Sequence, residues 1–231
     1  MLADARSAGC MTAPMARLQA FPRRPLLRCA VLAAATLLLL ESAGPAAAAA
    51  TYPPLFGTRE IASKSLKLFP KWRGVMERFV EEKGSCASPL CNQEYWKKVI
   101  DGLAGADRRT QIDTINREMN EKLYIIDPIN WGVPDYWATP FQFDRKNGDC
   151  EDYAIAKFMA LRALGFENPE MRIVVLNDLN LGIAHAILVV YVDGKALVLD
   201  NQIKSVVPAD SIRHYQPVYS VNEDGWWLHR P

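Results

Sequence analysis

The sequence is poor in the residues that most often carry catalysis, with three histidines and five cysteines among its 231 residues. No hydrophobic run approaches the ~20 residues that a membrane-spanning helix needs. The formal net charge is +1, which argues against a nucleic-acid partner, because such proteins normally carry a clustered basic surface. Half of the residues are hydrophobic, so the chain can bury one real core and is not disordered throughout.

The N-terminus has the pattern of a secretory signal peptide. Arg17, Arg23, Arg24 and Arg28 precede the uncharged run 29–40, and an alanine-rich stretch ending at Ala50 follows. A basic segment, a short apolar core and an Ala-x-Ala exit are typical of such signals, whereas a buried helix would show polar positions at helical spacing. We therefore expect a cleaved signal peptide over 1–50, with cleavage between Ala48 and Thr51, and one exported domain over 51–231.

Removing this segment changes the charge and the cysteine count. Five arginines and two acids leave with it, so the 27 basic and 26 acidic residues become 22 and 24, a balance of −2. Cys86, Cys91 and Cys150 remain. An odd number in an oxidising compartment indicates one disulfide and one free thiol. The short CASPLC loop predicts a Cys86–Cys91 disulfide and leaves Cys150 as the thiol to be explained.

Hydrophobic spacing predicts helices in the first half of the chain and a helix followed by strands in the second. The expected helices cover 66–82, 92–103, 107–123 and 150–164. The expected strands cover 171–176, 184–192 and 195–200, with a hairpin turn at Asp193-Gly194 and an edge strand at 218–221. This order predicts an α+β fold.

Between these halves, residues 125–149 are rich in proline, glycine and aromatic residues and follow no regular period. Long ordered loops of this kind are uncommon unless they build a functional site. Packing of the aromatic side chains over the core is the simpler alternative, and the two are compatible.

Cys150 stands at the start of the best predicted helix. The helix dipole and the free N–H groups there stabilise a thiolate, the nucleophilic form of cysteine. Asp149 is a natural N-cap, with Asp152 as its capping-box partner. The negative charges of Asp149, Glu151 and Asp152 disfavour a thiolate, however. A thiolate therefore needs a partner histidine, a bound cation, or carboxylates that point away from the sulfur.

His185 is the natural partner, since His214 and His229 lie in the tail, which shows no clean pattern. The two-residue turn pairs positions whose numbers sum to 387, which places His185 and Asp200 on one sheet face as diagonal neighbours. The hairpin thus predicts a His–Asp pair that would complete a Cys–His–Asp triad. A structural histidine and a turn-forming aspartate are the simpler readings of these two residues.

These residues occur in motifs that resemble a known family. GDCEDYAIAK, HAILVV and LVLDN, with WGVPDYWATPFQF upstream and PVYSVNEDGWWL near the end, resemble the bacterial transglutaminase-like cysteine peptidases, the group that contains the LapG-type periplasmic proteases. The resemblance implies a papain-like transglutaminase core, in which N-terminal helices and the cysteine helix pack on an antiparallel sheet. It also implies Cys150 as nucleophile, His185 as base and Asp200 as the residue that orients the imidazole.

The resemblance further implies a periplasmic endopeptidase that cleaves a large surface adhesin near its N-terminus, releases it from the cell and so controls biofilm attachment. It implies inhibition by the periplasmic domain of an inner-membrane cyclic-di-GMP receptor. It implies a calcium requirement as well, with Asp149, Glu151 and Asp152 as candidate ligands, which fits the preference of calcium for carboxylate oxygens.

Some assignments stay open at this point. The backbone N–H of Cys150 is one expected oxyanion donor, and Trp137, Gln142 and Asn147 are candidates for the second. A transglutaminase-like acyltransferase would use the same triad. A non-catalytic binding module, or a zinc site built from Cys150, His185 and Asp200, are further alternatives.

Overall fold

The computed structural model describes residues 52–84 and 93–231. The predicted signal peptide and the predicted Cys86–Cys91 disulfide lie outside these residues and stay predictions. Among the described residues, no helix combines the length and the apolar character that crossing a membrane requires.

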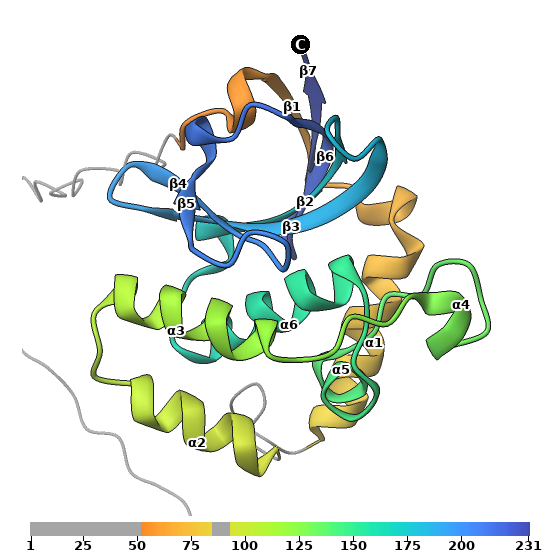
Figure 1. Ribbon diagram of the computed structural model, residues 1–231, viewed down its shortest axis with the longest axis vertical. Coiled ribbons are helices and arrows are strands. Elements are labelled where there is room, and N and C mark those ends of the chain that lie inside the picture. Colours follow the sequence, from red (N-terminus) through yellow and green to blue (C-terminus); the bar gives the residue numbers. More distant parts are fainter. Residues whose placement is uncertain (1–51, 85–92) are drawn as a thin grey trace, which may run out of the picture. The chain divides into compact units, whose positions relative to one another are not determined.

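The fold is built on one seven-stranded sheet in which every strand pair is antiparallel (Figure 1). The spatial order is β1-β7-β6-β2-β3-β4-β5. The strands are β1 (Arg59–Ser63), β2 (Met171–Asp178), β3 (Ile183–Val192), β4 (Lys195–Leu199), β5 (Val207–Pro208), β6 (Tyr215–Val221) and β7 (Trp226–Arg230). The sheet predicted from the second half of the chain is therefore present, and β1 joins it from the first half.

The predicted edge strand at 218–221 is wrong in its position. It belongs to β6, which lies inside the sheet because β7 pairs with its free side. His229, placed by the sequence in an irregular tail, lies in β7 and is buried between Thr58 and Ser220.

Six α-helices are described, and Figure 1 shows α3 and α6 together on one side of the sheet. The helices are α1 (Pro70–Lys83), α2 (Glu94–Leu103), α3 (Arg108–Asn120), α4 (Asp127–Asn130), α5 (Pro140–Lys146) and α6 (Cys150–Ala163). Short 3₁₀ turns complete the elements: η1 (Leu55–Gly57), η2 (Leu66–Leu68), η3 (Asn168–Glu170) and η4 (Ala209–Ser211).

Two predicted helix boundaries need correction. The helix predicted from residue 66 starts only at Pro70, because proline lacks the N–H that a preceding turn would need and disfavours helical backbone at the residue before it. The helix predicted to reach residue 123 ends at Asn120, so the side chain of Leu123 is 67% exposed instead of continuing the core stripe.

The segment predicted as a long loop contains two short helices, α4 and α5. Thr139 caps α5, with Gln142 three residues later closing a capping box and Pro140 at the first helical position. Each of these is a standard start signal. The surrounding prolines and aromatic residues interrupt any hydrophobic period, and the loop prediction rested on that lack of a period.

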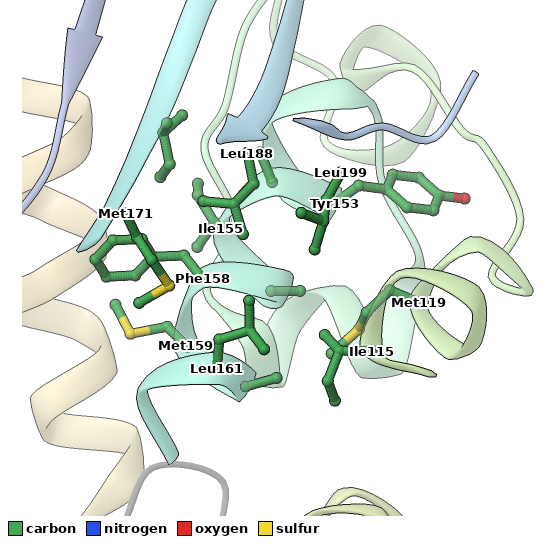
Figure 2. Close-up of a cluster of buried hydrophobic side chains, with 14 of the residues drawn as sticks. Ile115, Met119, Tyr153, Ile155, Phe158, Met159, Leu161, Met171, Leu188 and Leu199 are labelled. Atoms are coloured by element: carbon green, nitrogen blue, oxygen red, sulfur yellow. The ribbon is translucent and has the colours of Figure 1, made fainter. Parts of the chain in front are cut away.

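The core lies between α6 and the sheet. Figure 2 shows Ile155 and Phe158 of α6 with Leu188 of β3 and Leu199 of β4 in one cluster. Residues 151–161 of α6 are all buried, so this helix runs through the core instead of lying on its surface. Phe158 also meets Trp72 of α1 edge to face, with ring centroids 5.7 Å apart.

A second cluster covers the other face of the sheet, away from α6. Strand positions alternate between the two clusters, so Leu188 and Val190 face α6 while Ile187 and Val189 face away. Leu55, from the N-terminal segment, is fully buried in this second cluster. Both faces of the central strands are therefore covered, which explains why these strands are almost continuously apolar.

The hairpin that the sequence predicted is present with the predicted register. Val192 pairs with Lys195 and Leu188 with Leu199. Asp193 and Gly194 have φ values of 50° and 74°, as a two-residue hairpin turn requires.

Candidate active site

A pocket of about 570 Å³ opens at the N-terminus of α6. Cys150 and His185 both line it, together with Asp149, Glu151 and Trp137. The remaining wall residues come from the segment before α1, the start of α1, the 124–137 region and the sheet: Leu68, Phe69, Pro70, Lys71, Trp72, Tyr124, Asp127, Pro134, Asp135, Val175, Ala184, Ala186 and Tyr219. The pocket thus joins the cysteine, the histidine and two of the three predicted metal ligands.

The structure brings His185 and Asp200 into the contact that the hairpin register predicted. His185 Nε2 lies 2.9 Å from Asp200 Oδ1, and the residues are 2% and 1% exposed. Burial alone would raise the pKa of Asp200, but hydrogen bonds from His185, Tyr215 and the Gln202 backbone hold it below its usual value. Asp200 is therefore a buried carboxylate that stays ionised beside the imidazole.

The partners of the imidazole define its tautomer. Because Asp200 accepts at Oδ1, Nε2 carries the proton and donates it there. Nδ1 lies 3.4 Å from the side-chain nitrogen of Gln202, which can only donate, so Nδ1 presents its lone pair. Nδ1 is thus the basic nitrogen of the ring.

The thiol of Cys150 is turned toward a carboxylate. It donates a hydrogen bond to Glu151 Oε2 over 3.2 Å, and the backbone N–H of Ala186 donates to the sulfur. Burial raises the pKa of the thiol, and Glu151 and Asp149 raise it further. The thiolate expected from the helix N-terminus is therefore disfavoured while these acids keep their charge and no cation balances them.

Acidic side chains crowd the start of α6. Burial raises the pKa of Asp149, Asp152 and Glu151, in the case of Glu151 to about 8 with Asp149 as the next cause. Asp127 joins them from the start of α4, is 1% exposed, and has its pKa raised by burial to about 6. Sequence reasoning missed Asp127, and its place in the irregular segment before the cysteine was the available signal.

Two of these aspartates each offer an unused oxygen. Asp127 Oδ2 accepts from Tyr136 N–H and Asp149 Oδ2 accepts from Asp127 N–H. The Oδ1 atoms of Asp127 and Asp149 are both buried and have no hydrogen-bond partner within residues 52–84 and 93–231. A buried oxygen with no partner is costly, so these two atoms call for a bound cation or water.

The cluster fits a hard divalent cation. Carboxylate oxygens of Asp127, Asp149 and Asp152 lie within 4.8 Å of one another, and so do those of Asp127, Asp135 and Glu151. Calcium takes six to eight oxygen ligands, carboxylates among them. Asp152 also has a structural role, because its Oδ1 accepts from Ala138 N–H and its Oδ2 from Asp149 N–H.

Of the three candidate oxyanion donors, Trp137 is the one that lines the pocket. Gln142 closes the capping box of α5 and bonds to the Tyr136 hydroxyl. Asn147 follows α5 and accepts from Leu123 N–H through Oδ1.

Two buried polar residues near Asp200 were not predicted. Tyr215 donates its hydroxyl proton to Asp200 Oδ2 over 2.6 Å. Lys157 of α6 is fully buried, and burial lowers its pKa to about 7. The negative charge of Asp200 raises this pKa, but by less than burial lowers it. Lys157 stands among apolar residues in the sequence and Tyr215 among polar ones, and nothing there distinguishes either from an exposed polar position.

The chain belongs to the bacterial transglutaminase-like cysteine proteinase family (BTLCP), whose sequence profile matches residues 87–229. The resemblance inferred from the motifs is thereby confirmed, and so are the α+β, papain-like fold class and the cysteine peptidase class. Comparison with curated proteins finds no match.

Solved structures of LapG from Legionella pneumophila are similar to this chain. One is 34% identical with a TM-score of 0.53 and covers 58% of this chain and 76% of its own. A calcium-bound form is 30% identical with a TM-score of 0.55 and covers 68% of this chain and 86% of its own. An EGTA-treated form is 34% identical with a TM-score of 0.55, and the match covers 59% of this chain and 75% of that one.

Proposed function

We propose that this protein is a periplasmic cysteine endopeptidase that cleaves a large surface adhesin near its N-terminus and so releases it from the cell. The observation that carries the proposal is the buried His185–Asp200 pair, together with the pocket that the residues His185 and Cys150 both line. The family assignment supports the peptidase chemistry. The substrate class is the one that the resemblance to LapG-type proteases implies, and the similarity to the LapG structures supports that resemblance.

In this mechanism Cys150 is the nucleophile. Once the Gln202 side-chain nitrogen, 3.4 Å from His185 Nδ1, moves aside, Nδ1 takes the thiol proton. Asp200 keeps the imidazole oriented and stabilises the resulting imidazolium. The thiolate attacks the scissile carbonyl, His185 returns the proton to the leaving amine, and a thioester remains on Cys150. Water then attacks the thioester with His185 as base, which releases the acid product and restores the thiol.

Charge that develops on the carbonyl oxygen needs donors already aimed at it. The backbone N–H of Cys150 is one, because the first N–H groups of a helix have no intrahelical partner. Trp137 is the second candidate, since it lines the pocket.

Before this chemistry the thiol must leave Glu151, which now accepts its hydrogen bond. We infer that a calcium ion binds at Asp127, which belongs both to the carboxylate group with Asp149 and Asp152 and to the group with Asp135 and Glu151. When bound, this ion supplies positive charge that offsets the carboxylates around the sulfur. The calcium-bound and EGTA-treated forms of Legionella LapG support the choice of metal.

Location and regulation belong to the same proposal. The predicted signal peptide would export the chain to the periplasm. There the periplasmic domain of an inner-membrane cyclic-di-GMP receptor would hold the enzyme inactive, so that release of the enzyme ends biofilm attachment.

The test uses the mature chain, residues 51–231, and the N-terminal fragment of a large repeat adhesin from the same cell. We expect one cleavage with calcium, strongly reduced cleavage in EGTA, and none with Cys150→Ala. Exposed Glu94→Gln on α2 serves as the matched control and should cleave normally. Cleavage by Cys150→Ala would refute the proposal.

The same assay separates hydrolysis from acyl transfer. With a lysine-mimicking amine present, the endopeptidase should still form a free carboxylic acid at the new C-terminus. A stable amide at that end would instead identify a transglutaminase-like acyltransferase, and an unchanged cellular phenotype with Cys150→Ala would identify a binding module.

A further inference from the structure

We propose that Tyr215 is a positioning residue of the active site, which fixes Asp200 through its hydroxyl and the His185 imidazole through its ring. The proposal rests on the proposed function, because it assigns Tyr215 to the pair that activates Cys150. It adds a fourth side chain, from a different strand, to the three that the sequence motifs suggest.

The hydroxyl of Tyr215 completes the environment of the Asp200 carboxylate. Oδ1 accepts from His185 Nε2 and, over 2.8 Å, from the backbone N–H of Gln202. Oδ2 accepts from the Tyr215 hydroxyl over 2.6 Å. With donors on both oxygens, the carboxylate cannot rotate about its own axis without breaking a hydrogen bond, so Oδ1 stays aimed at the imidazole.

The ring of Tyr215 also touches the histidine. The rings of His185 and Tyr215 have centroids 5.9 Å apart and planes at 59°. Tyr215 is itself 5% exposed, and Phe56 packs against it at 6.0 Å and 67°. Tyr215 therefore occupies the space beside the imidazole and is held there by the N-terminal segment.

The sheet fixes the backbone that carries this side chain. Tyr215 is the first residue of β6 and pairs with Asp178 of β2. The neighbour of β2 on its other side is β3, which carries His185 opposite Leu176. Tyr215 on β6 and His185 on β3 are thus held by two strands that both pair with β2. This shared pairing fixes their relative position, which makes a precise contact possible.

Tyr191 provides a matched contrast within the same sheet. It lies in the same apolar cluster as Tyr215 and is 2% exposed. Its hydroxyl is buried and has no hydrogen-bond partner in the described part of the chain. Removing each hydroxyl in turn therefore compares two buried tyrosines, of which one contacts Asp200.

The test compares Tyr215→Phe with Tyr191→Phe in adhesin cleavage at saturating calcium. Because a hydrogen bond to a buried charged group is lost, we expect kcat to fall roughly tenfold in Tyr215→Phe while KM stays within about twofold. Tyr191→Phe should match the wild type. An unchanged kcat in Tyr215→Phe, or an equal loss in both variants, would overturn the proposal.

A second readout does not depend on cleavage. In ¹⁵N-histidine-labelled Cys150→Ala protein, the chain's few histidines can be assigned by substitution, and the Nε2–H proton of His185 should resonate far downfield. Adding Tyr215→Phe should move this signal, while adding Tyr191→Phe should not. Cleavage by Cys150→Ala would refute the peptidase itself, whereas an unmoved His185 signal would refute only the role of Tyr215.

Discussion

Glu151 should make the stability of the cation-free protein fall as the pH rises. Burial and Asp149 raise the pKa of this carboxyl from 4.5 to about 8. The folded state therefore binds the proton more tightly than the unfolded state, so ionisation above pH 4.5 destabilises the fold. The loss begins near pH 4.5, grows with pH and is complete above about pH 8.

The size of this effect follows from the two pKa values. Each unit of pKa difference corresponds to about 1.4 kcal/mol, which gives an upper limit of about 5 kcal/mol in all and about 3 to 4 kcal/mol between pH 5 and pH 8. Calcium should cancel much of the loss, since an ion at 100 times its dissociation constant stabilises by about 2.7 kcal/mol.

The assay is urea unfolding at pH 5 and pH 8, in EGTA and in calcium, for the wild type, Glu151→Gln and the exposed Glu81→Gln control on α1. In EGTA the unfolding free energy of the wild type should drop more steeply than that of Glu151→Gln, while Glu81→Gln should follow the wild type. Parallel pH dependence in the wild type and Glu151→Gln would refute the reasoning.

Three further substitutions test the packing around the site. Gly148→Ala should destabilise the fold by about 1–3 kcal/mol and weaken calcium binding by calorimetry, because a Cβ there would lie 2.1 Å from Oδ2 of the buried Asp152. Lys157→Met should raise the unfolding free energy by up to about 5 kcal/mol below pH 7, and by less at pH 10. The reason is that burial lowers the pKa of Lys157 to about 7, so the cost of its charge disappears as the pH rises. Phe158→Ala should lose about 3–5 kcal/mol in urea unfolding, since this ring is fully buried against Trp72; a loss below about 1 kcal/mol would contradict the packing described.

The elements that the sequence predicts well are those defined by local chemistry. Gly165 ends α6 with a φ of 88°, and Asp193-Gly194 sets the register that places His185 beside Asp200. In each case a residue with special backbone preferences determines the structure within a few positions, so no long-range information is needed.

The features that the sequence did not predict depend on contacts between distant segments. The interior position of β6 depends on its pairing with β7. The local sequence of neither strand predicts which strands will lie side by side. Asp127 reaches the start of α6 from 22 residues upstream, where its backbone donates to Asp149. The orientation of the Cys150 thiol toward Glu151 depends on burial, which sequence spacing alone cannot give.

The central claim is that Cys150 attacks the substrate and forms a thioester. The most direct measurement is acid quenching of the adhesin cleavage reaction, followed by mass spectrometry of the peptide that contains Cys150. The account predicts an adduct on Cys150 with the mass of the N-terminal product less one water, which accumulates during turnover and is absent from Cys150→Ala. The account would be contradicted if cleavage were efficient with no adduct on Cys150 and if the Cys150→Ala variant cleaved as fast as the wild type.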